Sequence, residues 1–495
     1  MADVIKTPSS RVRALWALPF RTSGEYVLYW MTATRRAKWN FALDRSVQLA
    51  RDLKKPLVIL EALRLDYPWA SERLHKFVLQ GMDDNRRSFA ETCVTYYPYI
   101  EPEPRAGSGL LRQLASRACV VVTDDSPQFF MPAMLAAARL EVDCRFEAVD
   151  SIGLLPLRST GKAFSRAFDF RRFLQRNLGQ HLTERPGADS LAGLELPRIG
   201  AELDEVKQRW PEATPALLMG EPLVLAELAI DHAVPPTNRK GGAASAEAAL
   251  SEFVGEKLPN YDEHRNRPEQ GGTSGLSAYL HFGHLSPHQV FAAIAAREGW
   301  TPDRLGDCRN GERVGWWGLD PSAASFLDQL VTWRELGLNV ATHQPDYDKF
   351  ASIPAWAKKT LADHADDERP YTYSLAQFEK AETHDELWNA AQQELRTDGV
   401  IHGYLRMLWG KKILHWSPSP QAAHEVMLEL NNKYALDGRD PNSHSGILWT
   451  LGKFDRAWGP ERDVFGKVRT MTSSNTRRKL RVSEYIARWT RNALS

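Results

Sequence analysis

The sequence has few cysteines, no long apolar run and almost no net charge. Its 495 residues include four cysteines, Cys93, Cys119, Cys144 and Cys308, and none of them forms a CxxC pair. This spacing excludes a disulfide scaffold, a cysteine-ligated zinc site and a cysteine-ligated iron–sulfur cluster, so we expect no metal. No stretch of about 18 apolar residues occurs, so we expect no membrane-spanning helix.

The N-terminal stretch and the charge balance narrow the class of protein further. Residues 1–6 lack the apolar core of a signal peptide, which indicates a cytoplasmic protein. The formal net charge is +1, from 63 basic and 62 acidic residues. This balance excludes a uniformly basic, histone-like binder, but it allows a local basic groove, because the position of charges matters more than their sum. A monomer is the expected state.

Between residues 20 and 150, short apolar runs alternate with helical patterns. The predicted strands are Tyr26–Trp30, Pro56–Leu60, Cys119–Thr123 and Val142–Val149, and the predicted helices are Ala37–Leu53, Glu72–Thr92 and Phe129–Arg139. Strands that alternate with helices imply βαβ crossovers, so this region is predicted to be an α/β domain with a mostly parallel, Rossmann-like sheet. No G-x-G-x-x-G motif follows any of these strands, so the domain has no dinucleotide-binding fingerprint of its own.

Beyond residue 150 the pattern changes twice. Periodicity weakens and basic residues cluster over residues 151–225, which we interpret as an inter-domain linker. Residues 226–490 are predicted to form an all-α domain. Its expected helices are Ala243–Lys257, Leu276–Arg297, Ser322–Thr342, His384–Leu395, Gly399–Trp416 and Pro420–Tyr434.

Tryptophan is abundant in the second half, where eleven of the 16 tryptophans lie from position 300 onward. Arg406, Trp409, Ile413 and Trp416 recur at helical spacing, so a guanidinium and two indoles share one stripe. Seven helical residues rise about 10.5 Å, which places Trp409 and Trp416 within a single electron hop. Trp388, on the preceding helix, could pack beside them. A plain aromatic core stripe is the alternative interpretation.

Two further features could bind a ligand. The segment Gly271–Ser277 places small hydroxyl residues just ahead of a predicted helix at Ala278–Phe282, where free N–H groups can hold a phosphate or pyrophosphate. An ordinary N-cap is the alternative. Asp437 could pair with Arg406, and a buried ion pair needs further hydrogen bonding to offset the free-energy cost of desolvation. A heterocycle with carbonyl and imide edges would supply it; a structural salt bridge is the alternative.

Several collinear stretches carry a resemblance to a known family. They are Gly24–Met31, Thr273–Gly283, Trp333–Leu336, His402–Leu414, Asn431–Asn442 and Val464–Arg469. Together they resemble the photolyase/cryptochrome family, and in particular the class II cyclobutane pyrimidine dimer (CPD) photolyases. The resemblance covers nearly the whole chain. It implies the photolyase architecture, an α/β antenna-type domain followed by an all-α FAD-binding domain.

The resemblance also implies a cofactor and the residues that hold it. The cofactor would be FAD, with Arg406 and Asp437 flanking the isoalloxazine as an ion pair and Asn431 facing its N5. The residues holding the phosphates and ribityl chain would be Tyr261, Thr273, Ser274, Gly275, Leu276 and Ser277. The photoreduction chain would be Trp388, Trp409 and Trp416. For the α/β domain, the class suggests an antenna chromophore of the deazaflavin type.

The implied substrate is UV-damaged DNA that contains a cyclobutane pyrimidine dimer. Trp333 and Trp449, with Met407 beside them, would form the apolar wall for a flipped-out lesion, since a damaged base costs less to unstack. The residues that would hold DNA phosphates are Arg265, Lys453 and Arg469. In the implied reaction, excited FADH⁻ donates an electron to the dimer, the ring splits and the electron returns.

Three features depart from the family pattern: the segment Thr472–Arg478, a longer loop from Trp300 to Pro321 and, most important, Gln329. Gln329 stands where the family carries a glutamate, which is thought to stabilise the radical anion of the dimer. Glutamine keeps a hydrogen-bond donor and acceptor but cannot offer a proton to developing negative charge. Asp328 could compensate in part, although neighbouring helical residues point about 100° apart.

Three hypotheses follow from these residues. The first is a light-dependent deoxyribodipyrimidine photo-lyase, weakened by Gln329. The second is a cryptochrome-like blue-light receptor that keeps FAD and the tryptophan chain; against it, the chain ends 15 residues after Leu480, with no long C-terminal extension. The third, a DNA-binding protein with an unrelated helical core, does not explain Arg406, Asp437 and Asn431 together.

Overall fold

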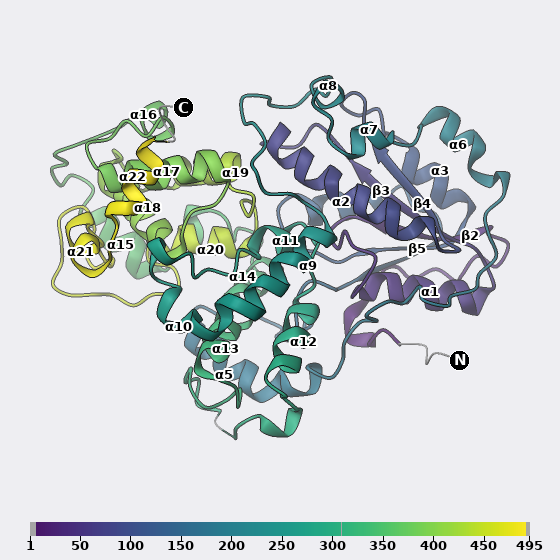
Figure 1. Ribbon diagram of the computed structural model, residues 1–495, viewed down its shortest axis with the longest axis horizontal. Helices are drawn as coiled ribbons and strands as arrows, with labels where there is room; N and C mark the ends of the chain where they lie inside the picture. The colour runs from purple at the N-terminus through teal and green to yellow at the C-terminus, as the bar shows by residue number, and fades with distance from the viewer. Residues whose placement is uncertain (1–5, 308, 492–495) are drawn as a thin grey trace. The chain divides into compact units, whose positions relative to one another are not determined.

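A computed structural model describes residues 6–307 and 309–491, which form two units (Figure 1). The α/β unit draws on the residues up to 159, on 177–252 and on 276–302. The helical unit draws on residues 160–176, on 253–275 and on the residues from 303 onward. Each unit therefore contains segments that are distant in the sequence, and each is described by itself below.

One six-stranded sheet forms the centre of the α/β unit. Its strands are β1 (Val12–Trp16), β2 (Tyr26–Met31), β3 (Leu57–Leu63), β4 (Thr95–Ile100), β5 (Ala118–Asp124) and β6 (Arg145–Val149), in the spatial order β1-β6-β5-β2-β3-β4. The pairs β2·β3, β2·β5, β3·β4 and β5·β6 are parallel, and β1 pairs antiparallel with β6. The predicted mostly parallel sheet is thus confirmed, with β1 and β4 as edge strands that the sequence pattern did not predict.

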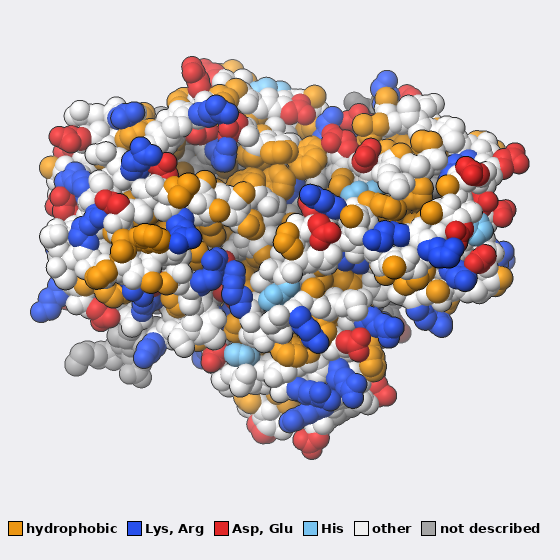
Figure 2. All heavy atoms as spheres, turned by 180° about the vertical axis from the view of Figure 1, so that it is seen from behind, with side chains coloured by type: hydrophobic (Ala, Val, Ile, Leu, Met, Phe, Trp, Pro, Cys, Tyr) orange, Lys and Arg blue, Asp and Glu red, His pale blue; other side chains and the backbone are white. Residues whose placement is uncertain are grey.

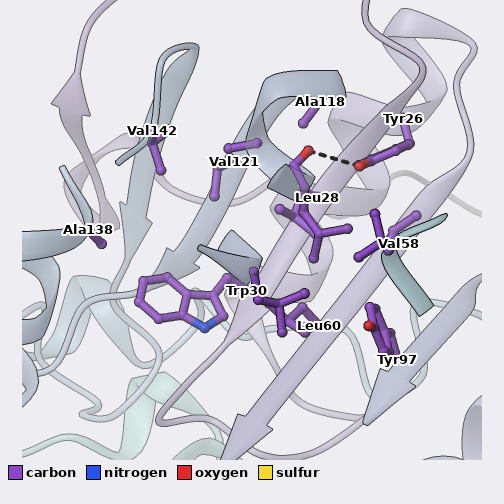
Figure 3. Close-up of a cluster of buried hydrophobic side chains, with 14 of the residues drawn as sticks. Tyr26, Leu28, Trp30, Val58, Leu60, Tyr97, Ala118, Val121, Ala138 and Val142 are labelled. Carbon is purple, nitrogen blue, oxygen red and sulfur yellow. Dashed lines mark hydrogen bonds between the residues drawn. The ribbon is translucent and has the colours of Figure 1, made fainter. Parts of the chain in front are cut away.

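Both faces of the sheet are covered, which explains why the interior strands β2 and β5 are mostly apolar and fully buried. Every residue of β2 is buried. Tyr26, Leu28 and Trp30 point into one core cluster, shown in Figure 3, and the alternate side chains of β2 point into a second cluster on the opposite face. The Tyr26 hydroxyl donates to the Leu114 carbonyl at 2.8 Å, so the one polar atom of this ring is paired inside the core.

Helices pack on both faces of this sheet and extend the unit. They are α1 (Phe41–Leu53), α2 (Glu72–Ala90), α3 (Leu110–Arg117), α4 (Met131–Ala138), α6 (Asp204–Arg209), α7 (Pro215–Leu218), α8 (Pro222–Leu225), α9 (Ala243–Glu252), α11 (Ser277–His281) and α12 (Pro287–Arg297). Asn40 caps α1, because its side chain accepts from the Ala42 and Leu43 N–H groups. The stretch predicted as a linker, 151–225, contains the short helices α6, α7 and α8 as well as α5 of the helical unit.

The helical unit consists of helices joined by turns and by longer irregular segments, such as the one between α20 and α21. They are α5 (Ala167–Asn177), α10 (Tyr261–His264), α13 (Pro321–Leu327), α14 (Arg334–His343), α15 (Ala355–Asp363), α16 (Leu375–Glu379), α17 (Glu386–Asp398), α18 (Gly403–Trp416), α19 (Pro420–Tyr434), α20 (Pro441–Thr450), α21 (Ser473–Lys479) and α22 (Ser483–Arg491). Two π-helical segments occur, η4 (Phe253–Lys257) after α9 and η8 (Asp328–Trp333) between α13 and α14. The predicted all-α domain is therefore confirmed in its type of structure.

Two predicted helices differ from the observed ones. The single helix predicted over Leu276–Arg297 is two helices, α11 and α12, because the chain turns at Gly283. This glycine has φ +74°, and a Cβ there would lie 1.9 Å from the Ala33 carbonyl oxygen, so only glycine fits this close approach. The helix predicted from Gly399 begins at Gly403 instead, since Gly399 is the left-handed C-cap of α17.

The described residues also bear on the predictions of what the chain lacks. In the ranges 6–307 and 309–491, no helix has the length and apolarity to cross a bilayer. Cys93, Cys119 and Cys144 are free thiols, and Cys308 lies outside the described residues.

Candidate functional site

An arginine–aspartate pair and an asparagine amide form one polar cluster in the helical unit. Arg406 lies on α18, and its Nη2 donates to Asp437 Oδ1 at 2.9 Å. Its Nη1 donates to Ser443 Oγ at 3.5 Å, and the Ser443 hydroxyl in turn donates to Asn431 Oδ1 at 3.2 Å. Asn431 lies on α19 and Ser443 on α20, and α18 packs against both helices. Helix packing thus unites residues that the sequence places up to 37 positions apart.

The surroundings of this cluster hold it in place while leaving one donor unused. Asn431 Nδ2 donates to Asn432 Oδ1 at 3.1 Å, and the same oxygen accepts from the Arg439 backbone N–H at 2.9 Å, which fixes the turn after α19. Asn431 is 2% exposed. Arg406 Nε is buried and has no hydrogen-bond partner among the described residues. A buried donor without a partner costs free energy, so this nitrogen is suited to an external acceptor.

Three tryptophans predicted to act together do lie together. Trp388 on α17 donates from Nε1 to the Trp409 carbonyl at 3.0 Å, and Trp409 donates from Nε1 to Gln392 Oε1 at 2.9 Å. The ring centroids of Trp388 and Trp416 are 6.0 Å apart at an interplanar angle of 71°. Each indole is at most 2% exposed. The arrangement allows electron exchange between rings that water does not reach, and Trp409 lies one turn along α18 from Arg406.

The two tryptophans predicted to form a lesion wall are stacked on each other. The centroids of Trp333 and Trp449 are 4.7 Å apart, with their planes within 16° of parallel. Both rings are half-buried, as is Met407. Trp333 closes the π-helical segment η8 and Trp449 lies on α20. A partly exposed, flat aromatic surface of this kind can accept another planar ring.

Gln329 and Asp328 have different environments although they are neighbours in η8. Asp328 is 5% exposed, and its carboxylate accepts two hydrogen bonds from Arg171, at 2.8 and 3.1 Å. Gln329 is half-buried. The idea that Asp328 could compensate for Gln329 is wrong, because the aspartate is committed to a buried bidentate pair. Segments of π-helix are frequent at functional sites, and this one carries Gln329 and Trp333 together.

The segment predicted to hold phosphates lies partly in each unit. Thr273–Gly275 belongs to the helical unit, and Leu276 and Ser277 belong to the α/β unit, where Ser277 opens α11. The predicted helix start is thus confirmed within one residue. Leu276, the N-cap, gives no side-chain cap to α11. The interpretation of this segment as a side-chain-capped helix start is therefore wrong, and its role in holding phosphates stays a prediction.

Tyr261 and Arg265 form a pair in the helical unit. The Arg265 guanidinium lies 5.8 Å from the centre of the Tyr261 ring, and Tyr261 is 7% exposed. Burial raises the pKa of the Tyr261 hydroxyl, and the Arg265 charge opposes that effect. Arg265 is half-buried, so its stem covers the tyrosine while part of its surface remains accessible.

The predicted phosphate-binding role of Lys453 needs correction. Lys453 is 6% exposed, and its ammonium donates to Ser352 Oγ at 2.8 Å and to the Tyr347 carbonyl at 3.2 Å. Burial lowers its pKa to about 8, although nearby aspartates oppose this shift. The side chain is engaged inside the helical unit and does not face a surface phosphate. Arg469, in contrast, is exposed, with its guanidinium 5.3 Å from the centre of the Trp458 ring.

Several residues of this region were not predicted from the sequence. Ser443 connects Arg406 to Asn431, and Gln392 holds the Trp409 indole, but single polar residues inside helices carry no sequence signal of such contacts. Tyr373 and His384 lie against Trp416, with ring centroids 5.6 and 5.0 Å from it. The sequence shows Tyr371, Tyr373 and His384 close together in the chain, but it gives no signal that they pack against Trp416.

The described part of the chain shows no group of three or more His, Cys, Asp or Glu side chains arranged to hold a metal ion. The prediction of no metal remains a prediction. The chemistry of the region is that of aromatic rings, one ion pair and amide groups.

Comparison with known proteins gives a consistent result. A deoxyribodipyrimidine photo-lyase of Methanothermobacter thermautotrophicus is 34% identical over 469 residues, which are 94% of each chain. Another, of Oryza sativa subsp. japonica, is 33% identical over 499 residues, 97% of this chain and 90% of the relative. No family model matches the chain.

A solved structure supports the fold. A bacterial class III photolyase from Agrobacterium tumefaciens matches with a TM-score of 0.66 at 16% identity, covering 94% of this chain and 86% of that chain. At this identity the likeness concerns the fold alone. It agrees with the predicted fold class, an α/β domain with a parallel sheet followed by an all-α domain.

Proposed function

The chain belongs to the deoxyribodipyrimidine photo-lyase family, and from this membership we propose that it repairs cyclobutane pyrimidine dimers in DNA under light, as a class II enzyme that carries FAD. The family recognised from the sequence and the expectation of an enzyme are confirmed. The class, the cofactor, the lesion and the residues that act on it are part of the proposal.

The observation that carries the proposal is the polar cluster on α18, α19 and α20, one turn from buried indoles. Arg406, Asp437 and Asn431 offer a cation, an anion and an amide within one hydrogen-bonded network. An isoalloxazine has carbonyl, imide and ring-nitrogen edges that match these donors and acceptors. Arg406 Nε supplies one donor that no described residue satisfies, so the residues present fit the cofactor.

In this proposal the protein binds and positions, and the cofactor reacts. When bound, FAD supplies light absorption and the transferred electron. Arg406 and Asp437 would orient the ring system, and Asn431 would offer N5 an amide that can both donate and accept. The residues that would hold the phosphates and ribityl chain are Tyr261, Thr273, Ser274, Gly275, Leu276 and Ser277. Trp388, Trp409 and Trp416 form the electron path that returns the cofactor to its reduced state.

The lesion would lie against the stacked pair of Trp333 and Trp449, with Met407 beside it. The stack offers an apolar surface to an extruded pyrimidine dimer, and removal of the dimer from the duplex costs little because the damaged bases are poorly stacked. Arg265 and Arg469 are the basic side chains with accessible surface that would hold the flanking phosphates. Phosphate contacts of this kind position DNA without reading its sequence.

A second candidate function, a blue-light receptor, is favoured by one residue. Gln329 lacks the proton that a glutamic acid would offer to the radical anion of the dimer. Return of the electron before the ring opens would therefore become more frequent relative to repair. A receptor would keep the cofactor and the tryptophans but would not turn over damaged DNA.

An illumination assay separates the two functions. Oligonucleotides with one cyclobutane dimer, single- and double-stranded, are incubated with the reduced holoprotein in blue light and in the dark. The enzyme hypothesis expects light-dependent loss of dimers on both substrates. Full photoreduction of the cofactor without any loss of dimers would reject repair and leave the receptor.

The same assay tests the role of Gln329. Gln329→Glu restores an acid beside the lesion wall, so we expect a higher yield of repaired dimer per absorbed photon than in the parent. Gln344→Glu, which makes the same chemical change at the end of α14, serves as the matched control and is expected to leave the yield unchanged. An equal change in both variants would mean that charge alone, rather than the position of Gln329, affects repair.

For the α/β unit we propose an antenna role with a deazaflavin-type chromophore, which is the expectation for class II. The support is the likeness of the chain to the family. An absorption band in the purified protein that is separate from the flavin bands, and that transfers excitation to the flavin, would test it.

A further inference from the structure

A small cavity in the α/β unit contains none of the residues of the proposed repair site. It lies between α2 and the segment 236–240 that precedes α9, and its volume is about 210 Å³. Pockets for drug-sized ligands start at about 300 Å³, so a ligand of this cavity is small. Four of the lining residues are basic, and none is acidic. The basic ones are Arg73, Lys76, Arg239 and Lys240.

The charge of this cavity is not neutralised by the protein around it. Among the described residues, Lys76, Arg239 and Lys240 form no ion pair, although the whole chain has 62 acids for 63 bases. Asp84, one turn beyond the lining residues of α2, is engaged by Arg87 at 2.6 Å. Cations gathered in a hollow repel one another and raise the local concentration of anions.

The neutral side chains of the cavity also present hydrogen-bond donors. Gln80 Oε1 accepts from the Gly241 backbone N–H at 2.7 Å, so the oxygen end of this amide is occupied and its NH₂ group is left for a ligand. Thr237 Oγ1 accepts from the Arg239 backbone N–H at 3.2 Å, and its hydroxyl can still donate. Arg239 Nε is buried and has no hydrogen-bond partner in the described part of the chain. An acceptor with negative charge matches this set of donors.

The walls of the cavity are fixed before any ligand binds. On one side, Arg73 is 2% exposed and its Nε donates to the Pro235 carbonyl at 2.9 Å. On the other side, a Cβ added to Gly241 would lie 1.8 Å from the Phe77 carbonyl oxygen, so this segment packs directly on the backbone of α2. Because both ends of the segment are held, an anion that enters has little protein to order, which favours its binding.

We propose that this cavity binds a small anion with a terminal phosphate group, either inorganic phosphate or a phosphomonoester. A terminal phosphate carries a charge of about −1.5 to −2 at pH 7 and three strong acceptor oxygens, which suits several converging cations and donors. A phosphodiester of duplex DNA has only a single charge and lies on a wide convex surface, so it fits a hollow less well. This inference concerns the α/β unit and does not rest on the repair of DNA.

Phosphorus NMR and isothermal titration of the purified protein test the inference, with inorganic phosphate and phenyl phosphate as probes. We expect saturable binding of one equivalent of inorganic phosphate. Binding of phenyl phosphate at the same site would identify monoesters as ligands, and its exclusion would leave inorganic phosphate. For the monoester, affinity should rise as the pH passes about 6, because the second proton of the phosphate is lost there.

Two substitutions remove parts of the cavity without touching its buried wall. Lys240→Met, at an exposed position, is expected to weaken phosphate binding roughly tenfold, the usual effect of losing one charged hydrogen bond. Arg239→Lys keeps the charge but removes the Nε donor, and a smaller loss is expected. Arg87→Met is the matched control, because it removes a cation of α2 that is already paired with Asp84, and it should bind phosphate like the parent. Equal thermal unfolding without phosphate establishes that each variant folds.

Two results would overturn the inference. One is the absence of saturable phosphate binding by the parent. The other is an equal loss in Lys240→Met and Arg87→Met, which would mean that total charge, rather than the cavity, attracts the anion. If the parent bound no phosphate while Lys240→Met lost affinity for an undamaged DNA duplex, the cations would be assigned to DNA instead. Each of these results leaves the proposed repair function to its own illumination assay.

Discussion

Two lysines of the helical unit show that burial, more than residue type, decides what a basic side chain does. Lys411 is 2% exposed, and its ammonium donates to the Thr450 carbonyl at 2.6 Å. Burial lowers its pKa from 10.5 to about 7, with Asp455 opposing the shift. Lys453 is buried in the same manner. The sequence predicts Lys453 as a DNA contact, and neither lysine can be distinguished from a surface lysine without the packing around it.

Lys411→Met is expected to stabilise the protein, most strongly near and below pH 7. The unfolded chain holds the lysine proton up to about pH 10.5, and the folded chain releases it near pH 7, so the parent gains stability as the pH rises between these values. Methionine removes this pH-dependent cost. Thermal unfolding measured from pH 6 to pH 10 should therefore show a gain for the variant that shrinks as the pH rises.

Lys380→Met is the control, because Lys380 is exposed and follows α16. Its unfolding curve should differ from the parent by a small amount that does not depend on pH in this way. A gain for Lys411→Met that stays constant to pH 10 would contradict the depressed pKa.

At the scale of the element, the interior strands were predictable and the edge strands were not. β2 and β5 are continuous apolar runs because helices cover both faces of the sheet. β4 contains Pro98, which argues against a strand in any sequence pattern, and it is tolerated here because β4 lies at the edge of the sheet. β1 has mixed polarity and only one neighbour, β6, so its apolar signal is weak.

The π-helical segment η8 could not be predicted from its sequence. Residues 322–342 show one helical pattern, and the structure follows it except where i→i+4 pairing gives way over Asp328–Trp333. Its first residue, Asp328, pairs with Arg171 on α5, 157 positions earlier, a tertiary contact that the local sequence pattern does not reveal. The candidate site also depends in part on tertiary contacts. The pairing of Arg406 with Asp437 could be predicted from the sequence by resemblance, whereas the contacts of Ser443 and Gln392 arise only from helix packing.

Helix α2 contains a glycine whose replacement we expect to be costly. An added Cβ at Gly81 would lie 2.3 Å from Nε2 of His284, which is 1% exposed and stacked against Phe77. Because the imidazole has no room to move, Gly81→Ala should lower the free energy of unfolding by about 1–3 kcal/mol despite the better helix propensity of alanine. Chemical denaturation of the variant measures this loss.

Gly446→Ala in α20 is the matched substitution, because no atom lies within 4 Å of its added Cβ. It should raise the free energy of unfolding by up to about 1 kcal/mol. If both variants lost stability equally, the loss would not come from the contact with His284.

At the scale of the whole molecule, affinity for DNA must come from a few positions. The net charge is +1, and on the face shown in Figure 2 lysine and arginine side chains are interspersed with aspartate and glutamate. Long-range attraction to DNA is therefore weak, and individual exposed cations carry the electrostatic part of binding.

Arg469→Ala should weaken binding to damaged and intact DNA alike, and should reduce the slope of log K against log salt concentration by about one. The reason is that one exposed guanidinium is lost from the set that displaces counterions. Fluorescence anisotropy at several salt concentrations gives the slope. Lys453→Met is the control, since its ammonium is engaged inside the protein and its removal should leave the slope unchanged.

The bidentate bond between Arg171 and Asp328 has an evolutionary consequence. It anchors the backbone beside the proposed lesion wall of Trp333 and Trp449 through a residue committed to Arg171, so the next position can change its side chain while the scaffold stays fixed. Glutamine and glutamate codons differ by a single nucleotide. A change between glutamine and glutamate at position 329 can therefore alter the proton-donating ability of the proposed lesion pocket while the Arg171–Asp328 anchor stays in place.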